Sequence, residues 1–223
     1  MRSILFDTET TGLNPITGDR LIEIAALELW NDLPTGKTFH RFVDPERDIP
    51  EEATRVHGIA REFLIGKPLF AEIAEEFLEF VGDAKLVAHN APFDFGFLDA
   101  ELSRLGRAVL DRSRMIDTLR LAKQRFPGMP NSLDSLCRRF GIDLSERSTH
   151  NALLDCKLLA EVYIELTGGR QRGLSLAAQR ADPPTAIYQV TTSRIPRAVQ
   201  STQVETHAHA AFLDGLTEPL WLT

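Results

Sequence analysis

The sequence predicts an α/β fold built around a mixed sheet. Three apolar, partly β-branched runs come early, at residues 4–6, 21–30 and 38–43, and they are typical of an antiparallel strand meander. Two later runs, at 86–88 and 115–116, read as short strands, each followed by a helical pattern. A strand followed by a helix predicts a parallel addition to the sheet, so both kinds of strand pairing are expected.

A long amphipathic helix is expected after Pro68. Its apolar residues recur at helical spacing, which predicts a helix packed on the sheet and assigns its aromatic side chains to the core rather than to a binding site. These residues are Phe70, Ile73, Ala74, Phe77, Leu78 and Val81.

The length of 223 residues corresponds to one full domain with a smaller appendage. Hydrophobic residues make up 43% and charged residues 26%, which is ordinary globular usage and excludes a wholly disordered chain. We place the domain at residues 1–167. Residues 168–205 are rich in small, polar and Pro residues without sustained periodicity, as in a flexible linker, and residues 206–223 form a tail.

The formal net charge of −7 excludes a surface that binds nucleic acid through overall basicity, so an anionic substrate would need a local cation. An acid at position 7 precedes any signal-length apolar run, and no stretch approaches membrane-spanning length. We therefore expect a cytoplasmic protein with no membrane partner. Cys137 and Cys156 each lie in an apolar helical pattern, which favours buried free thiols.

Asp7 and Glu9 are the first candidates for chemistry. They follow the apolar run at 4–6, and side chains two apart in a strand share a face, so both carboxylates should project together while Phe6 turns into the core. An acid pair at a solvated strand end also occurs by chance. The adjoining TTG at 10–12 favours a functional site, because a turn there would leave the strand end open at a cleft.

Two later segments supply further candidates. In HNAPFD, at 89–94, Asp94 falls in the first turn of an expected helix, where an acid also simply stabilises the helix dipole. His150 and Asp155 are five residues apart, which on a helix separates them by about 140°, so His150 should lie in the loop or first turn before the helix. Asp155 stands among leucines. A buried carboxylate there favours a metal or a Lys or Arg partner, and no cation stands four residues away.

Four acids from separate segments, without a Cys cluster or a His pair, form an all-oxygen ligand set that suits Mg²⁺ or Mn²⁺ rather than Zn²⁺. Two such cations about 3.5–4 Å apart would offset the carboxylates and hold the attacking and leaving oxygens of a phosphodiester displacement. They would also supply the positive potential that an acidic domain lacks, so that a polyanion can approach the cleft.

These segments resemble a known family. DTET at 7–10, HNAPFD at 89–94 and HNALLD at 150–155 stand in the order and contexts found in the DEDDh 3'→5' exonucleases. The resemblance covers nearly all of residues 2–169. It implies a ribonuclease H-like fold, with the predicted mixed sheet flanked by helices.

Other stretches are similar to the epsilon-type proofreading subunits of bacterial DNA polymerase III. They are VHGI at 56–59, MIDTLRLAKQRFPG at 115–128 and NSLDSLC at 131–137. This resemblance implies removal of mispaired nucleotides from DNA 3' ends. Because a mispaired terminus loses less pairing and stacking energy on leaving the duplex, selectivity for errors needs no base readout.

The resemblance also implies a role for each motif residue. His150 would be the general base, which agrees with an imidazole that titrates near working pH. The two Mg²⁺ or Mn²⁺ ions would be held by Asp7, Glu9, Asp94 and Asp155. The pocket for the terminal nucleotide would be lined by Thr10, Glu52, His57 and His89. Glu52 is also consistent with a plain helix-start acid, and His150 with a helix-capping surface histidine.

A short apolar stripe near the C-terminus favours docking on a partner, because a tail without a core of its own cannot bury it. In the resembled family this partner is the polymerase alpha subunit, and packing back on the nuclease domain is the alternative. The contact residues that we expect are Phe212, Leu213, Leu216 and Trp221. QRGLSL at 171–176 is similar to a sliding-clamp peptide, with Leu174 and Leu176 as anchors.

Two other functions stay open from the sequence. A DEDDh exoribonuclease that trims RNA ends would share all five active-site residues and differ in its partner and sugar pocket. A scaffold that binds polymerase and clamp without catalysis fits the tail, but it leaves a complete set of acids unexplained.

Overall fold

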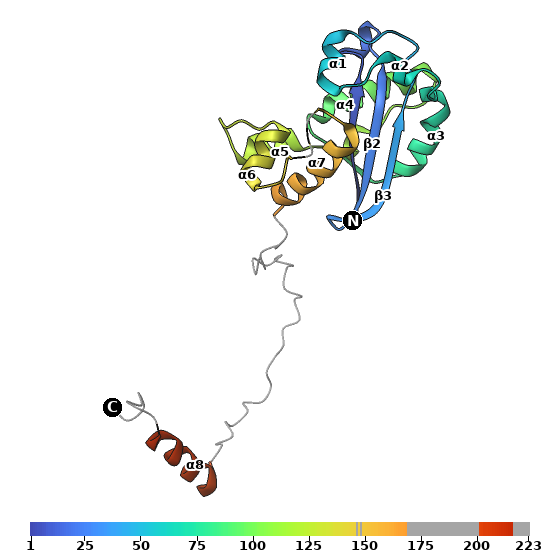
Figure 1. Cartoon of the computed structure of the whole chain (residues 1–223). Helices are drawn as coiled ribbons and strands as arrows, with labels where there is room; N and C mark the ends of the chain where they lie inside the picture. The colour runs from blue at the N-terminus through green and yellow to red at the C-terminus, as the bar shows by residue number, and fades with distance from the viewer. Residues whose placement is uncertain (146, 148, 169–200, 216–223) are drawn as a thin grey trace. The chain divides into compact units, whose positions relative to one another are not determined.

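The computed structural model describes residues 1–145, 147, 149–168 and 201–215. The chain divides into two units, Met1–Ser175 and Leu176–Thr223, which are described separately. The first unit is a five-stranded sheet with helices on both faces (Figure 1). Within the described part of the chain, no helix has the length and apolar character needed to cross a membrane.

The sheet has the strand order β3-β2-β1-β4-β5. An antiparallel meander is formed by β1 (Arg2–Thr10), β2 (Leu21–Trp30) and β3 (Leu33–Phe42). On the other side of β1, β4 (Lys85–Ala88) and then β5 (Met115–Asp117) are added in parallel. The predicted mixed sheet is therefore confirmed, including which strands are antiparallel and which are parallel.

Strand β3 is longer than the run at 38–43 predicts. A two-residue turn at Asn31 and Asp32, both with positive φ, joins β2 directly to Leu33. Such a turn matches the twist of the flanking strands and starts the pairing at once. The first part of β3 is exposed along the sheet edge, so its side chains carry no hydrophobic pattern that could reveal it. Val43, the predicted end, still donates its N–H to the carbonyl of Ile22 (2.8 Å).

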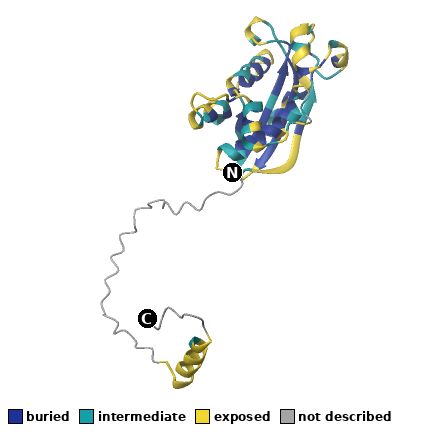
Figure 2. Cartoon of the chain, turned by 60° about the vertical axis from the view of Figure 1, so that its left-hand side comes forward, coloured by how far each residue is buried: buried dark blue, intermediate teal, exposed yellow. Residues whose placement is uncertain are grey.

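One face of the sheet is covered by α3 (Phe70–Val81) and α4 (Ala91–Arg104). The predicted amphipathic helix is confirmed as α3, whose apolar residues pack against Ile4 and Phe6 of β1. In Figure 2 much of the sheet is coloured as buried, in contrast to the exposed loops around it. Because the side chains of a strand alternate between its two faces, Ile4 and Phe6 share this face, and Leu5 between them points to the opposite face.

The opposite face is covered by α5 (Thr118–Arg125), α6 (Leu133–Phe140) and α7 (Ala152–Leu166). Leu5 of β1 packs into this second core together with the buried side of α7. Both cysteines lie here as fully buried free thiols, as the sequence predicts: Cys137 in α6 and Cys156 in α7.

Several short elements connect the strands and the longer helices. The short 3-10 helix η1 (Pro15–Thr17) follows β1. A second one, η2 (Arg112–Arg114), directly precedes β5. Helices α1 (Glu51–His57) and α2 (Arg61–Leu64) lie between β3 and α3. They are held by a small third apolar cluster that includes Ile22, Ile59 and Leu64.

The second unit contributes one described helix, α8 (Gln203–Asp214). Thr202 begins it with a capping box that involves Glu205. Phe212 is 62% exposed on it, and no residue of the helix is buried. Of the other residues expected to contact partners, Leu213 lies on α8, whereas the remaining four lie outside the described residues. These are Leu174, Leu176, Leu216 and Trp221.

Candidate active site

A cleft of about 740 Å³ opens where β1 ends. Its walls are β1 and the turn after it, helix α1, the start of α4, and the loop before α7. All five residues predicted to carry the chemistry line this one cleft, although they come from three separate segments. They are Asp7, Glu9, Asp94, His150 and Asp155.

Strand β1 presents the first two carboxylates. The apolar run ends at Phe6, but the strand continues to Thr10, so Asp7 and Glu9 lie within the strand rather than at its solvated end. They alternate with Phe6 and therefore share the face of α7. The predicted turn follows directly, and it needs a glycine at position 12 because a Cβ there would collide with the Asp19 carboxylate.

Helix α4 delivers Asp94 to the same place. The helix begins after Asn90, which adopts the left-handed conformation, and Asp117 of β5 accepts hydrogen bonds from the backbone N–H groups of Asn90 (3.0 Å) and Ala91 (3.4 Å). Asp94 then falls in the first turn and is 3% exposed. The Thr8 hydroxyl donates to its Oδ1 (2.7 Å), which ties α4 to β1 beside the other two carboxylates.

His150 lies in the loop before α7, as its spacing from Asp155 predicts. Its backbone N–H donates to the carbonyl of Val56 in α1 (3.2 Å), so the loop is held against the far wall of the cleft. Asn151 caps the helix by accepting from the N–H of Leu154 (3.0 Å). The imidazole is half exposed and accessible from the cleft.

Asp155 has a cation partner that sequence reasoning missed. Arg147 donates from Nε to Oδ1 and from Nη2 to Oδ2, both at 2.7 Å, which is the bidentate geometry of a strong guanidinium–carboxylate pair. Its Nη1 donates to Asp134, and its Nη2 also lies 2.9 Å from Nδ1 of His150. Arg147 lies in a loop eight residues before Asp155. The sequence prediction considered only cations four residues from Asp155, the spacing of neighbours on a helix, and therefore missed it.

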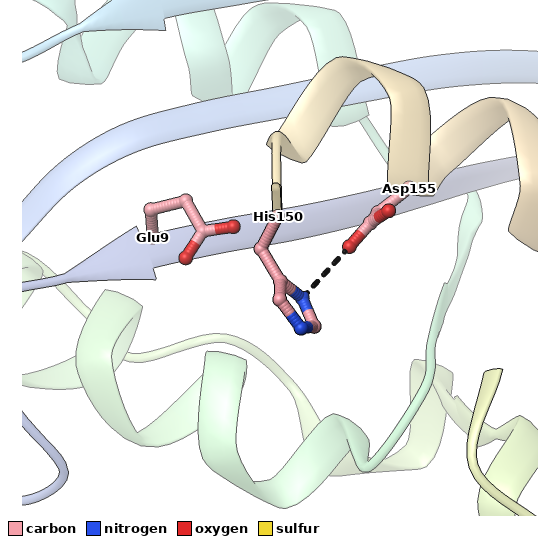
Figure 3. A group of neighbouring side chains, drawn as sticks. All are labelled: Glu9, His150 and Asp155. Atoms are coloured by element: carbon pink, nitrogen blue, oxygen red, sulfur yellow. Dashed lines mark hydrogen bonds and ion pairs between the residues drawn. The ribbon is translucent and has the colours of Figure 1, made fainter. Parts of the chain in front are cut away.

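Three of the predicted residues converge most closely. Figure 3 shows Glu9 projecting from β1 toward the imidazole of His150, with the Asp155 carboxylate of α7 on the other side. A ligand atom from each lies within 4.8 Å of the others, and His150 Nδ1 is 3.2 Å from Asp155 Oδ2. This arrangement leaves room for a cation between side chains.

The carboxylates that line the cleft differ in their charge at neutral pH. Burial raises the pKa of Glu9 to about 8, with further contributions from the negative charges of Glu23 and Asp155. Burial likewise raises the pKa of Asp94 to about 7, although the Thr8 hydrogen bond opposes this. The pKa of Asp7 lies well above its ordinary value for the same reason, with Asp94 adding to it.

Asp155 behaves in the opposite way. Burial alone would raise its pKa, but the hydrogen bonds from Arg147 and His150 outweigh it and hold the pKa below its ordinary value. Of the four carboxylates predicted to bind metal, Asp155 is therefore kept ionised by a built-in cation, whereas burial raises the pKa of the other three. Such raised pKa values are the signature of negative charges assembled without enough positive charge to balance them.

A buried glutamate supports this arrangement from behind. Glu23 of β2 is fully buried, and its Oε1 lies 2.7 Å from Nε2 of His40. The same carboxylate accepts from the side-chain amide of Asn151 (3.2 Å) and the backbone N–H of Ala152 (3.5 Å), at the N-terminus of α7. Its signal in the sequence is weak, because Glu23 is one of two acids in the apolar run 21–30, the other being Glu28.

His57 and His89, the two histidines expected to contact the terminal nucleotide, line the cleft. In each ring one nitrogen makes a hydrogen bond, and the other has no partner among the described residues. His57 Nδ1 accepts from the N–H of Ile59 (3.0 Å), which leaves a proton on Nε2. His89 Nδ1 bonds the Thr118 hydroxyl (2.9 Å), which itself donates to the Ala88 carbonyl, so Nε2 of His89 is an acceptor. Neither Nε2 atom has a hydrogen-bond partner among the residues that the structure describes.

The two other predicted pocket residues also line the cleft. The Thr10 hydroxyl is already used within the turn, where it donates to the carbonyl of Gly12 (2.6 Å). Glu52 lies exposed in the first turn of α1 and thus satisfies both interpretations of its sequence position, pocket wall and helix-start acid.

Comparison with known proteins decides the family. The family model described as Exonuclease matches residues 4–163. DNA polymerase III subunit epsilon of Rickettsia felis is 46% identical over 222 residues, covering 97% of each chain. The Escherichia coli subunit is 44% identical over 226 residues, covering 96% of this chain and 92% of its own. The chain belongs to the exonuclease family, as an epsilon-subunit homologue.

Solved structures place this epsilon homologue in the same fold. Exonuclease X in complex with 5' overhanging duplex DNA has a TM-score of 0.58 at 25% identity, covering 74% of this chain and 90% of its own. The nuclease domain of 3'hExo, a DEDDh family member bound to rAMP, has a TM-score of 0.64 at 18% identity, covering 74% and 91%. DEDDh exonucleases use divalent metal ions, and the carboxylate-rich cleft fits that requirement because oxygen ligands suit hard cations.

Proposed function

We propose that this chain is a 3'→5' exodeoxyribonuclease that removes mispaired terminal nucleotides as the proofreading subunit of a replicative DNA polymerase. One observation carries the proposal: four carboxylates and a histidine from separate segments line a single cleft, in a chain that aligns with epsilon subunits over 97% of its length. A scaffold without catalysis would have no reason to bury this much unbalanced negative charge.

Two Mg²⁺ or Mn²⁺ ions would be held by Asp7, Glu9, Asp94 and Asp155. The fit rests on the donor set, which is rich in oxygen, and on the raised pKa values of Glu9 and Asp94, which favour uptake of positive charge. When bound, the cations would supply the charge that stabilises the attacking and leaving oxygens of the phosphodiester.

His150 would take the proton of the attacking water. An Nδ1–H donated to Asp155 would leave the lone pair of Nε2 for this proton. The half-exposed ring suits this role, since the water must reach it from the cleft.

The terminal nucleotide would bind beside this centre. His57 and His89 line the cleft, and their Nε2 atoms, a donor and an acceptor, are buried without a partner among the described residues. A nucleotide, which carries both oxygen acceptors and a hydroxyl, would bond them once neighbouring side chains move aside. Thr10 and Glu52 would complete the wall. A mispaired 3' end reaches this pocket more readily because it unstacks at lower cost.

The C-terminal part would attach the nuclease to its polymerase. We propose that Phe212 and Leu213 of α8, with Leu216 and Trp221 later in the sequence, contact the alpha subunit, since an exposed aromatic on a helix without buried residues favours a partner surface. The linker predicted at residues 168–205 would act as a tether that keeps the nuclease concentrated near the polymerase, although it ends earlier than predicted, at Thr202, where α8 begins. Leu174 and Leu176 would contact the sliding clamp.

The test is hydrolysis by the purified chain of four 5'-labelled substrates: single-stranded DNA, a matched duplex, a duplex with a 3' mismatch, and single-stranded RNA. We expect a ladder that shortens from the 3' end, faster release from the mismatched than from the matched duplex, and abolition by EDTA. Asp7→Ala and Asp155→Ala should be almost inactive. Preferential hydrolysis of RNA would contradict the proposal and favour an exoribonuclease.

A further inference from the structure

The guanidinium of Arg147 is the only Lys or Arg side chain among the described residues that line the cleft. It is itself largely buried, with 9% of its side chain exposed. Its three nitrogens contact three different acceptors, namely Asp155, Asp134 and Nδ1 of His150. All three guanidinium nitrogens of Arg147 are therefore engaged, within a site that is proposed to bind metal.

The pair with Asp155 conflicts with metal binding. Both carboxylate oxygens of Asp155 accept from Arg147 at 2.7 Å, so the oxygens that a cation would need are already taken by a positive group. A divalent ion and a guanidinium cannot share these oxygens without bringing like charges into close contact at low solvent exposure.

The same guanidinium also contacts His150, the proposed general base, through Nδ1 of its ring (2.9 Å). When Nη2–H of Arg147 donates to Nδ1 of His150, that nitrogen must be unprotonated and the ring proton lies on Nε2. The only lone pair of the neutral ring is then in use. In this tautomer His150 has no free site for the proton of a water molecule, whereas departure of Arg147 allows the tautomer in which Nδ1–H donates to Asp155 and Nε2 is free.

We propose that Arg147 is a displaceable internal cation that holds the cleft closed to metal, and that a divalent ion must expel its guanidinium from Asp155 before the site is assembled. The inference rests on the metal site proposed above. It gives the buried Asp155 carboxylate a partner when no metal is bound, and it makes loading of the metal and release of His150 a single event.

Asp134 provides a second place for the displaced charge. It lines the same cleft and bonds Nη1 of Arg147, and its side chain is 35% exposed, so it does not need the guanidinium to stay buried. Arg147 can thus leave Asp155 while it remains paired with Asp134. There its freed donors face a cleft that would hold a phosphodiester, for which guanidinium is a suitable partner.

The test measures Mn²⁺ binding to the full chain without DNA, by the electron paramagnetic resonance signal of free Mn²⁺ at pH 8.5 under argon. We expect Arg147→Ala to bind Mn²⁺ at least about tenfold more tightly than the wild type. Tenfold corresponds to about 1.4 kcal/mol, which is at the lower end of what hydrogen bonds to charged groups contribute. Arg147→Lys should fall between the two, because an ammonium cannot make the bidentate contact.

Arg138→Ala is the matched control. Arg138 also pairs with Asp134 (3.7 Å), but it is 71% exposed and is not among the residues that line the cleft, so its loss should leave Mn²⁺ affinity within about twofold. Circular dichroism establishes that each variant is folded, and Arg147→Lys serves as the test if the alanine variant is not. Equal or weaker binding in the Arg147 variants, with a wild type that binds Mn²⁺, overturns this inference alone. No binding by the wild type overturns the proposed metal site and this inference together.

Discussion

At the scale of single residues, the neighbour of each carboxylate decides its charge. Arg147 keeps Asp155 ionised, whereas Asp94 has neutral donors, the Thr8 hydroxyl and backbone N–H groups, and Glu9 lies near the further negative charge of Glu23. Identical functional groups within one cleft therefore titrate in different ranges. The chemistry of the cleft depends on these partners as much as on the carboxylates themselves.

The role of His150 gives the first prediction. His150→Ala should lower kcat on single-stranded DNA by about 10²- to 10⁴-fold, the usual contribution of a general base, and leave Mn²⁺ affinity within a few fold. His209→Ala, on the exposed helix α8, is the control and should have normal activity on free DNA. A parallel loss of Mn²⁺ binding in His150→Ala would identify the imidazole as a ligand instead.

The raised pKa values give a pH prediction. In the fold the pKa of Glu9 is about 8 instead of 4.5, and that of Asp94 about 7 instead of 3.8, so the folded metal-free chain binds more protons than the unfolded chain between these limits. Their contribution to stability is therefore complete at about pH 4 and is lost as the pH rises toward 8. Metal must displace the same protons, so its affinity should rise over this range.

Thermal unfolding from pH 5.5 to 8.5 measures both effects. In EDTA, these two groups should lower the unfolding temperature as the pH increases, and the increase in unfolding temperature caused by Mn²⁺ should grow and then level off above about pH 8. Calorimetry in two buffers of different ionisation enthalpy should detect proton release at pH 6.5. A Mn²⁺ effect that is independent of pH would contradict the assignment of Glu9 and Asp94 as ligands.

At the scale of elements, the site depends on how α7 is fixed to the sheet. The N-terminus of α7 carries Asp155 and follows His150, and Glu23 of β2 binds it through Asn151 and Ala152. The hydrogen bond between Glu23 and Asn151 joins residues 128 apart in sequence. A strand in the middle of the meander therefore positions the last part of the cleft.

Glu23→Ala tests this anchor. We expect the free energy of unfolding to fall by about 1–3 kcal/mol, because buried donors lose their acceptor, and kcat to fall while KM changes little. Glu23→Gln keeps one acceptor oxygen and should recover part of both losses. Glu76→Ala removes an exposed ion pair with Arg41 and should change stability by less than about 1 kcal/mol. A Glu23→Ala enzyme that is destabilised but fully active would show that the anchor is structural only.

At the scale of the whole molecule, the nuclease unit has its own cores on both faces of the sheet, whereas α8 has no buried residue. The first unit can thus hold its cleft without the second. This division fits an enzyme whose catalytic part works on free DNA and whose C-terminal part serves to bind a partner.

Two aspartate substitutions on α8 test the docking role. Phe212→Asp should weaken binding to the polymerase alpha subunit by at least about tenfold, since loss of a buried interface aromatic commonly costs 2 kcal/mol or more, and should spare hydrolysis of free DNA. Ala210→Asp is the control, because two residues along a helix place a side chain about 200° around the axis. Surface plasmon resonance with immobilised alpha subunit measures both. Equal binding by wild type and Phe212→Asp would place the contact elsewhere.

Periodicity and spacing predicted the kind of sheet, helix α3 and the position of His150 before α7, because they report which face a side chain occupies and which residues share it. The five residues that meet in the cleft were candidates by their spacing, and the resemblance of their motifs to a known family brought them together as one site. The exposed start of β3 was missed, because an edge strand in contact with water carries no such pattern.

Only the tertiary structure decided which groups are partners. Arg147 on Asp155, Glu23 beneath Asn151, and the unused Nε2 atoms of His57 and His89 depend on loops and strands that packing brings together. Local sequence pattern fixes the direction of a side chain within its own element. The charge and hydrogen-bonding state of that side chain depend on distances to other elements, which are set by how the two cores pack around the sheet.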